Sequence, residues 1–274
     1  MLMPEKFSWS HLGSTQCGVW PMALFILSSV AYVYAARRHG AWSGARTANW
    51  FAAVAVAIIA TQSVIGVYDM YLFADHMIQH LLLIMVAGPL FAAAAPLDLI
   101  RDSSSRIDRW CDATIGRVAL SPVFAFGLYA VFIPLTHLTG LFNAMLEHMW
   151  LHHLEQFLFL VVGYLFFRHV LGNERGTTLH PGLGLVYVMA AVPVDTVSGL
   201  SLVMTKANPF PAYNLMHPMW ASSIISDIHL GGAIMWIGGD FLMLAWLAPI
   251  VVRWLKFEAR TTKIIDAELD RLGL

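Results

Sequence analysis

Residues 73–95, FADHMIQHLLLIMVAGPLFAAAA, decide the fold of this chain. The run is long enough to cross a bilayer as one helix, which takes about 20 residues. Similar apolar runs fill most of the remaining sequence, and of 274 residues 58% are hydrophobic and only 12% are charged. That charged fraction is about half of what a soluble domain carries. We therefore expect an all-α, polytopic membrane protein.

The apolar runs predict a bundle of seven transmembrane helices. Residues 1–274 are expected to form a single membrane domain, because the connections are too short to hold a large soluble domain. Residues 253–274 are charged and predict a cytoplasmic amphipathic tail. The predicted spans are 18–37, 48–68, 73–95, 119–139, 148–170, 183–204 and 224–252.

The distribution of basic residues predicts the orientation of the bundle. Of the sixteen Lys and Arg residues, all but Lys6 and Lys206 fall on one side of the predicted spans. Loops rich in Lys and Arg remain in the cytoplasm. The N-terminus is therefore expected outside and the C-terminus in the cytoplasm. The basic rim predicts contact with anionic membrane lipids. The sequence has no basic patch with aromatic residues that would indicate nucleic-acid binding.

The segment 97–118, LDLIRDSSSRIDRWCDATIGRV, is the longest connection on the basic side. Its apolar residues have a spacing compatible with a short helix lying in the membrane interface. A loop anchored by Trp110 is the simpler interpretation, and we expect a loop here.

Pairs of histidines at the start of two predicted spans indicate a metal site. His76 and His80 stand one helical turn apart, and His148 and His152 repeat that spacing. Both spans enter the membrane from the outer side, so the four imidazoles are expected at one depth. Imidazole is a common ligand of copper, zinc and iron. The predicted metal ligands also include two residues at the start of the seventh span and are His76, His80, His148, His152, His229 and Asp227.

Several neighbouring residues could contribute to this site or support it. Thioether sulfur would favour Cu(I) over other ions. Copper is the expected ion, with haem or zinc as alternatives. The lone histidines His137, His153 and His217 are more simply explained as packing residues that form hydrogen bonds. The possible additional ligands or supporting residues are Met77, Met149, His153, Asp75 and Met235.

Two carboxylates, Asp195 and Asp240, fall deep within predicted spans. Such residues need a partner, and a proton or cation path is one possible reason for their presence. A hydrogen bond to a neighbouring helix is the interpretation that we favour. Gly231, Gly232 and nearby glycines are expected to allow close approach of helices.

Three motifs together resemble the CtaG family of cytochrome c oxidase assembly factors, the branch associated with caa-type oxidases. They are HMIQHLLL at residues 76–83, the H-x-x-x-HH start of the fifth span, and DIHLGGAIMWIGGD at residues 227–240. The resemblance extends from about residue 20 to 252 and includes the seven spans. It implies that His76, His80, His148, His152 and Asp227 are characteristic polar positions. His229 stands where we expect Gln in this family.

The resemblance implies a multi-pass protein of the bacterial inner membrane that acts in oxidase assembly rather than as an enzyme. We expect it to bind copper on the outer side and deliver it to a cytochrome c oxidase subunit, with a soluble copper chaperone on the outer side as a further partner. One alternative is a membrane cytochrome in which the histidines bind haem for electron transfer. Another is a metal or solute transporter that uses Asp195 and Asp240.

Overall fold

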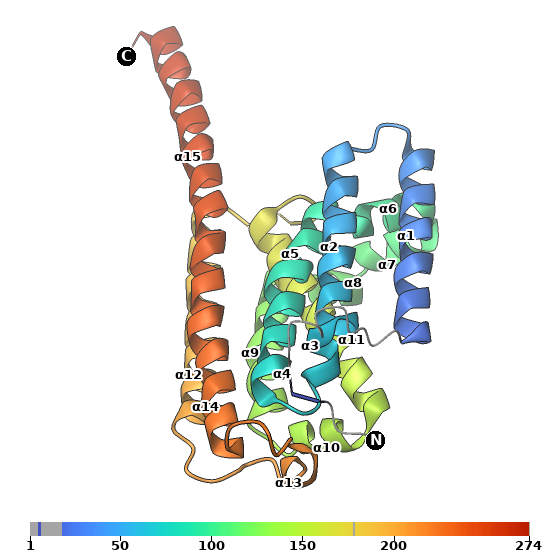
Figure 1. Ribbon diagram of the computed structural model, residues 1–274. Coiled ribbons are helices and arrows are strands. Elements are labelled where there is room, and N and C mark those ends of the chain that lie inside the picture. Colours follow the sequence, from blue (N-terminus) through green and yellow to red (C-terminus); the bar gives the residue numbers. More distant parts are fainter. Residues whose placement is uncertain (1–4, 7–17, 178, 274) are drawn as a thin grey trace.

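The computed structural model describes residues 5–6, 18–177 and 179–273, and in these ranges all regular secondary structure is helical. The predicted all-α membrane architecture is confirmed. Six segments are long and apolar enough to span a membrane, and a bent pair of helices forms a seventh candidate. Figure 1 shows these segments running up and down through one bundle. The orientation of this bundle in the membrane stays a prediction.

The first four spans contain several short breaks. α3 continues α2 after a break at Ser63, and a π-helix, η2, interrupts the third span. The fourth span bends by 65° between α9 and α10. Their elements are α1 (Val19–His39), α2 (Gly44–Gln62), α3 (Val64–Tyr68), α4 (Phe73–Leu81), η2 (Leu82–Ala87), α5 (Gly88–Ala94), α9 (Pro122–His137) and α10 (Leu141–Glu147).

The fifth, sixth and seventh spans complete the bundle, and the last helix of the seventh span continues beyond it. A short helix, α13, lies in the connection between the sixth and seventh spans. The predicted tail is not a separate element, because the final helix runs unbroken from the membrane segment to Leu272 (Figure 1). The elements are α11 (Met149–Leu171), α12 (Pro181–Val203), α13 (Tyr213–Met216), α14 (Ile224–Ala233), η3 (Ile234–Gly238) and α15 (Gly239–Leu272).

The connection expected to be a loop is helical, so that expectation was wrong. It forms α6 (Pro96–Ser103), α7 (Ser105–Asp112) and α8 (Thr114–Ala119). α7 begins where the Ser104 side chain accepts a hydrogen bond from the Ile107 backbone. Its polar and apolar residues separate onto opposite faces, as expected for a helix in a membrane interface. The amphipathic spacing was therefore a better guide than the presence of several serines.

The α4–η2–α5 span and α11 are packed against each other at the centre of the bundle. They cross where Gly88 meets Gly163. A Cβ atom on Gly163 would lie 2.3 Å from the carbonyl oxygen of Ile84, so the crossing requires glycine. Gly199 and Gly232 allow a similar approach of α12 to α14, which confirms the expected role of Gly232.

Replacing Gly163 with Ala is expected to destabilise the protein by about 2 kcal/mol, because the added methyl group must push two backbones apart. Thermal unfolding in detergent measures this effect. Gly127 on α9 is a matched control, since a Cβ atom there would have no neighbour within 4 Å. Equal unfolding temperatures of the two variants would show that the helix crossing accommodates the added methyl group without loss of stability.

We call the end of the bundle that carries most of the basic residues the basic end. A buried ion pair stabilises it. The Arg168 Nε atom donates to Glu174 at 2.9 Å, and both side chains are almost fully buried. Tyr164 and the backbone of Leu97 also donate to Glu174. Through Glu174, these contacts connect α11 to α6. α4, which carries His76 and His80, begins at the opposite end of the bundle (Figure 1).

Candidate metal centre

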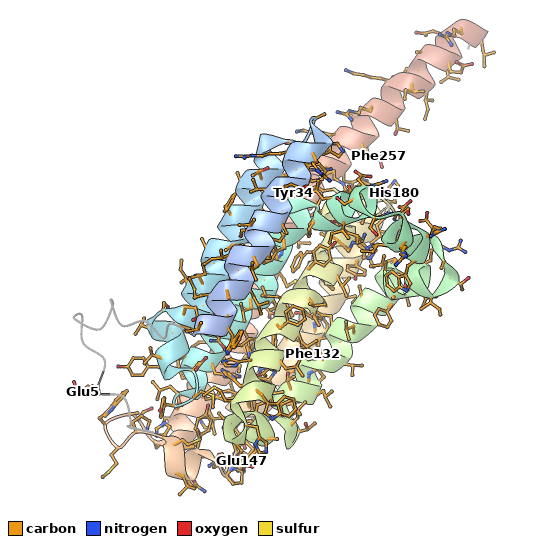
Figure 2. All side chains as sticks on the ribbon, turned by 90° about the vertical axis from the view of Figure 1, so that its right-hand side faces the viewer. Glu5, Tyr34, Phe132, Glu147, His180 and Phe257 are labelled. Carbon is orange, nitrogen blue, oxygen red and sulfur yellow. The ribbon has the colours of Figure 1, made fainter. Side chains whose placement is uncertain are left out.

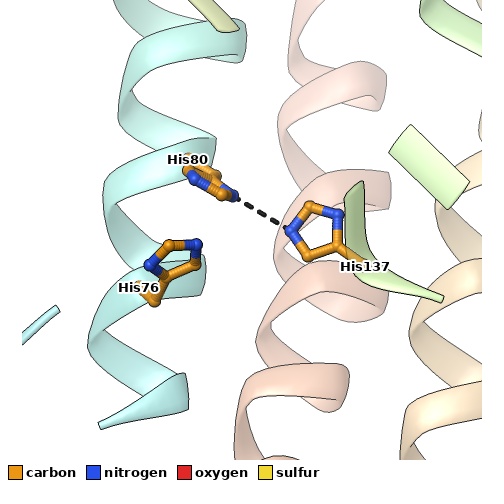
Figure 3. Close-up of side chains that lie close together, drawn as sticks. All are labelled: His76, His80 and His137. Atoms are coloured by element: carbon orange, nitrogen blue, oxygen red, sulfur yellow. Dashed lines mark hydrogen bonds between the residues drawn. The ribbon is translucent and has the colours of Figure 1, made fainter. Parts of the chain in front are cut away.

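Four histidines and one glutamate meet in the interior near the end opposite the basic residues. We call this group the histidine cluster, and each residue in it is at most 3% exposed. α4 and α11 supply two residues each, and α9 supplies one from its last turn. Figure 3 shows His76 and His80 on successive turns of α4, with His137 facing them. The members are His76, His80, His137, His152 and Glu155.

Glu155 lies at the centre of three imidazole rings. Its carboxylate oxygens are 3.7 Å from His76 Nε2, 3.5 Å from His80 Nε2 and 3.5 Å from His152 Nδ1. These separations are too long for strong hydrogen bonds. They match the distance between ligand atoms around a tetrahedral ion, about 3.4 Å for bonds of about 2.1 Å. Of these side chains, His76, His152 and Glu155 have ligand atoms close enough to one another to share one metal ion, and His80 contacts the same carboxylate.

The atoms that face each other in this centre have no hydrogen-bond partner in the structure. They include both carboxylate oxygens of Glu155, Nε2 of His76 and His80, and Nδ1 of His152. Leaving a buried polar atom unpaired costs about 1–3 kcal/mol. Ligand atoms within 4.8 Å of one another occur in two overlapping triads, His76–His152–Glu155 and His76–His80–His137, and each could hold a metal ion.

His137 determines which nitrogen of His80 faces the centre. His137 Nδ1 lies 2.9 Å from the carbonyl oxygen of Ile133, which only accepts. In a neutral His137 the other nitrogen, Nε2, then accepts from His80 Nδ1 at 3.0 Å (Figure 3). His80 therefore carries its proton on Nδ1 and presents the lone pair of Nε2 to Glu155. His137 thus orients a ligand, an arrangement common around metal ions.

Asp69 has the same effect on His152. Its carboxylate lies 3.1 Å from His152 Nε2, and the Gln156 amide nitrogen contacts that ring nitrogen at 2.9 Å. The charged acceptor outweighs the neutral amide, so Nε2 keeps the proton and Nδ1 faces Glu155. Gln79 donates to Asp69 and to the carbonyl oxygen of Ala60. A carboxylate behind a ligating histidine is a recurrent feature of metal sites.

Aromatic side chains separate the cluster from the nearby end of the bundle. Phe73, Phe142, Phe210 and Tyr213, which we call the aromatic lid, are each at most 2% exposed. The Phe142 ring is 4.8 Å from the His76 ring and 4.4 Å from the Phe210 ring. Burial raises the pKa of Tyr213 well above its usual value, so its hydroxyl keeps its proton. On the far side, Phe159 stacks on His80 at 3.7 Å.

Asp227 joins the lid to the start of α4. Its carboxylate accepts hydrogen bonds from the backbone of Phe73 at 2.7 Å and Ala74 at 3.2 Å. The same carboxylate lies 3.5 Å from His217 in the connection after α12. Asp227, predicted as a ligand, is thus placed to fix the helix and the lid, outside the residues that surround Glu155.

The structure separates the second histidine pair that the sequence suggested. α11 begins at Met149, so His148 is its N-cap, with φ −129° and ψ 100°, and its side chain is exposed. His152 lies within the helix and shares a face with Glu155. His153 is exposed, and His229 donates to the carbonyl oxygen of Thr205 at 2.8 Å.

The other residues considered near the site are spread over the bundle. Asp75 is half-buried, while Met77 and Met235 are buried in the apolar core. Met149 lines a cavity of about 130 Å³ with Asp69, His152 and His153. This cavity leads to the proton-bearing side of His152.

The two deep carboxylates form hydrogen bonds to neighbouring helices, as favoured from the sequence. Tyr129 donates to Asp195 at 2.6 Å, and Thr196 donates to Asp240 at 3.1 Å. Asp195 is 2% exposed. A proton or ion path through these residues stays a prediction.

Glu155, His137, Asp69, Gln79 and Gln156 were missing from the predicted ligand set. A sequence signal existed for some of them. His76 is followed at i+3 and i+4 by Gln79 and His80, and His152 is followed at the same spacings by Glu155 and Gln156. Those spacings place each trio on one helix face.

Comparison with known proteins identifies relatives over nearly the whole chain. The family described as cytochrome c oxidase caa3 assembly factor matches residues 30–256. Uncharacterized proteins of Mycobacterium bovis and Mycobacterium tuberculosis are each 28% identical over 249 residues, which cover 85% of this chain and 38% of theirs. A Mycobacterium leprae protein is 25% identical over 267 residues, 92% of this chain and 40% of its own.

The chain therefore spans about two fifths of the length of these curated relatives. No solved structure matches it. The family match covers most of the chain and includes every member of the histidine cluster. The protein belongs to the cytochrome c oxidase caa3 assembly factor family, Caa3_CtaG.

Proposed function

We propose that this protein holds a copper ion in the histidine cluster and delivers it to a cytochrome c oxidase subunit during assembly. The observation that carries the proposal is the group of unpaired ligand atoms around Glu155. Family membership supplies the process, which is oxidase assembly. The cargo would be bound by His76, His80, His152 and Glu155, while His137 and Asp69 orient two of these rings.

The ligand chemistry supports copper or zinc more than it supports haem. Three imidazoles and one carboxylate suit a divalent transition metal. The ligand atoms of His76, His152 and Glu155 lie within 4.8 Å of one another, and Phe142 and Phe159 pack against the rings of His76 and His80. A porphyrin between two axial histidines would require much more space. Between copper and zinc, we favour copper because the family acts in the assembly of a copper-containing oxidase.

The proposed receiver is an oxidase subunit, and a soluble copper chaperone on the outer side is the proposed donor. The predicted orientation places the cluster beneath the outer surface. The small cavity between Met149 and His152 supports a route of entry on that side, since thioether and imidazole groups can bind copper in succession. No bond-making catalysis is part of this proposal.

Metal analysis of the purified protein after exposure to copper tests the proposal, and about one copper per chain is expected. Replacing Glu155 with Gln is expected to weaken copper binding on the order of 10-fold to 100-fold, because the amide supplies no negative charge. Glu147→Gln is the matched control, since Glu147 is exposed and accepts a hydrogen bond from Asn143.

An optical spectrum of the same sample distinguishes the alternatives. A Soret band would support haem and contradict the proposal. If the protein retains zinc in preference to copper, zinc is the bound ion and the proposal of copper is wrong. Equal copper binding by the Glu155 and Glu147 variants would remove the histidine cluster as the binding site.

A further inference from the structure

The structure contains a second polar cavity, at the basic end and far from the histidine cluster. Its volume is about 730 Å³, and it lies between α15 and the connection from α11 to α12. Figure 2 shows His180 and Phe257 together at this place, where α15 leaves the bundle. Their rings are 4.9 Å apart. No member of the histidine cluster lines this cavity.

One face of α15 lines the cavity with three basic side chains. Arg253, Lys256 and Arg260 follow each other at spacings of three and four residues, so they form a stripe along the helix. In the part of the chain that the structure describes, no carboxylate lines the cavity. Glu258 is on another face, where it accepts a hydrogen bond from Trp254.

The three basic residues have different roles. Arg253 donates to the carbonyl oxygens of Val170 and Leu171 and so joins α15 to the end of α11. Lys256 and Arg260 have no carboxylate within ion-pair distance among the described residues. Two neighbouring cations are therefore available to an anion in the cavity.

The wall of the cavity changes from apolar to basic along α15. Pro249 and Val252 line the part nearer the membrane centre, and Lys256 and Arg260 line the part beyond it. This change occurs where the apolar run of the last span ends. A phospholipid has the same sequence of groups, with acyl chains below a phosphate.

We propose that this cavity binds an acidic phospholipid, with its phosphodiester between Lys256 and Arg260 and an acyl chain along Pro249 and Val252. Basic pockets between transmembrane helices are known to bind lipid headgroups in this way. A soluble anion would have no need of the apolar wall. The bound lipid would fill the space between α15 and the end of α11 and hold the two helices together.

Native mass spectrometry of the full chain in detergent tests this proposal, with phosphatidylglycerol and phosphatidylcholine as probes. The wild-type protein is expected to bind phosphatidylglycerol more tightly. The double variant Lys256→Gln/Arg260→Gln is expected to lose roughly 30-fold in affinity for it, because two favourable charges are removed. A matched control is Lys263→Gln/Arg271→Gln, which removes the same charge from the exposed part of α15.

Several results would overturn the proposal. Equal affinity of the two double variants would show that the cavity is not the binding place. Equal binding of the two lipids would show that the headgroup charge is not recognised. Displacement of phosphatidylglycerol by millimolar inorganic phosphate would assign the cavity to a soluble anion. None of these results depends on copper, so the test is independent of the proposed function.

Discussion

Replacing His76 and His80 together with Ala is expected to abolish copper binding and to prevent maturation of the oxidase. Both rings direct unpaired nitrogens at Glu155, and removing them leaves only two of four proposed ligands. The affinity is expected to fall by far more than about 100-fold, since even residues that only support a ligand contribute 10-fold to 100-fold. Copper competition with a chelator measures the first effect, and oxidase activity in membranes measures the second.

The matched control for this variant is His148→Ala/His153→Ala. It removes the same number of imidazoles from nearly the same depth, but both side chains are exposed. Thermal unfolding and size-exclusion profiles of both variants check that the bundle remains folded. A folded His76→Ala/His80→Ala variant that binds copper like the control would contradict the proposed site.

Replacing Arg168 with Met is expected to destabilise the protein by about 3 kcal/mol, the lower end of the range for breaking a buried ion pair. Glu174 would keep its hydrogen bonds from Tyr164 and Leu97 but lose its countercharge. Burial raises the pKa of Glu174 even beside Arg168, so desolvation is only partly offset. The carboxyl group would relieve part of the loss by taking up a proton. Thermal unfolding in detergent measures this change.

The double variant Arg168→Met/Glu174→Gln is expected to recover much of that stability, because no charge is then buried without a partner. Arg271→Met serves as the control, since its pair with Glu268 is exposed and such pairs contribute little. If Arg168→Met unfolds at the same temperature as Arg271→Met, the ion pair does not stabilise the bundle.

The fold was predictable because membrane spans are encoded locally. Each span needs about 20 apolar residues, and that requirement is visible without knowing which helices touch. Six of the predicted spans correspond to helices long and apolar enough to cross a membrane, and the fourth corresponds to the bent pair of α9 and α10. The helices of residues 96–119 were missed because serine and aspartate are typical of both turns and helix starts. At Ser104 the serine starts a helix.

The candidate site was only partly predictable because it depends on helix starts and on contacts between helices. His76 and His80 lie inside α4, so their spacing placed both in the cluster. His148 precedes the first residue of α11, so the same spacing failed there. Asp69 comes from the turn before α4, and His137 comes from the last turn of α9. Periodic patterns in the sequence do not predict such contacts between helices.

The aromatic lid has a consequence for the lifetime of a loaded state. Phe73, Phe142 and Phe210 pack against one another at ring distances of 4.4–5.3 Å and cover the cluster on that side. Departure in that direction therefore requires the Asp227–His217 contact to open and the rings to move apart. For a proposed cargo that leaves in that direction, the residence time would depend on this rearrangement as well as on the strength of the metal–ligand bonds. A docked acceptor that displaces His217 would trigger release at the place where the ion is needed.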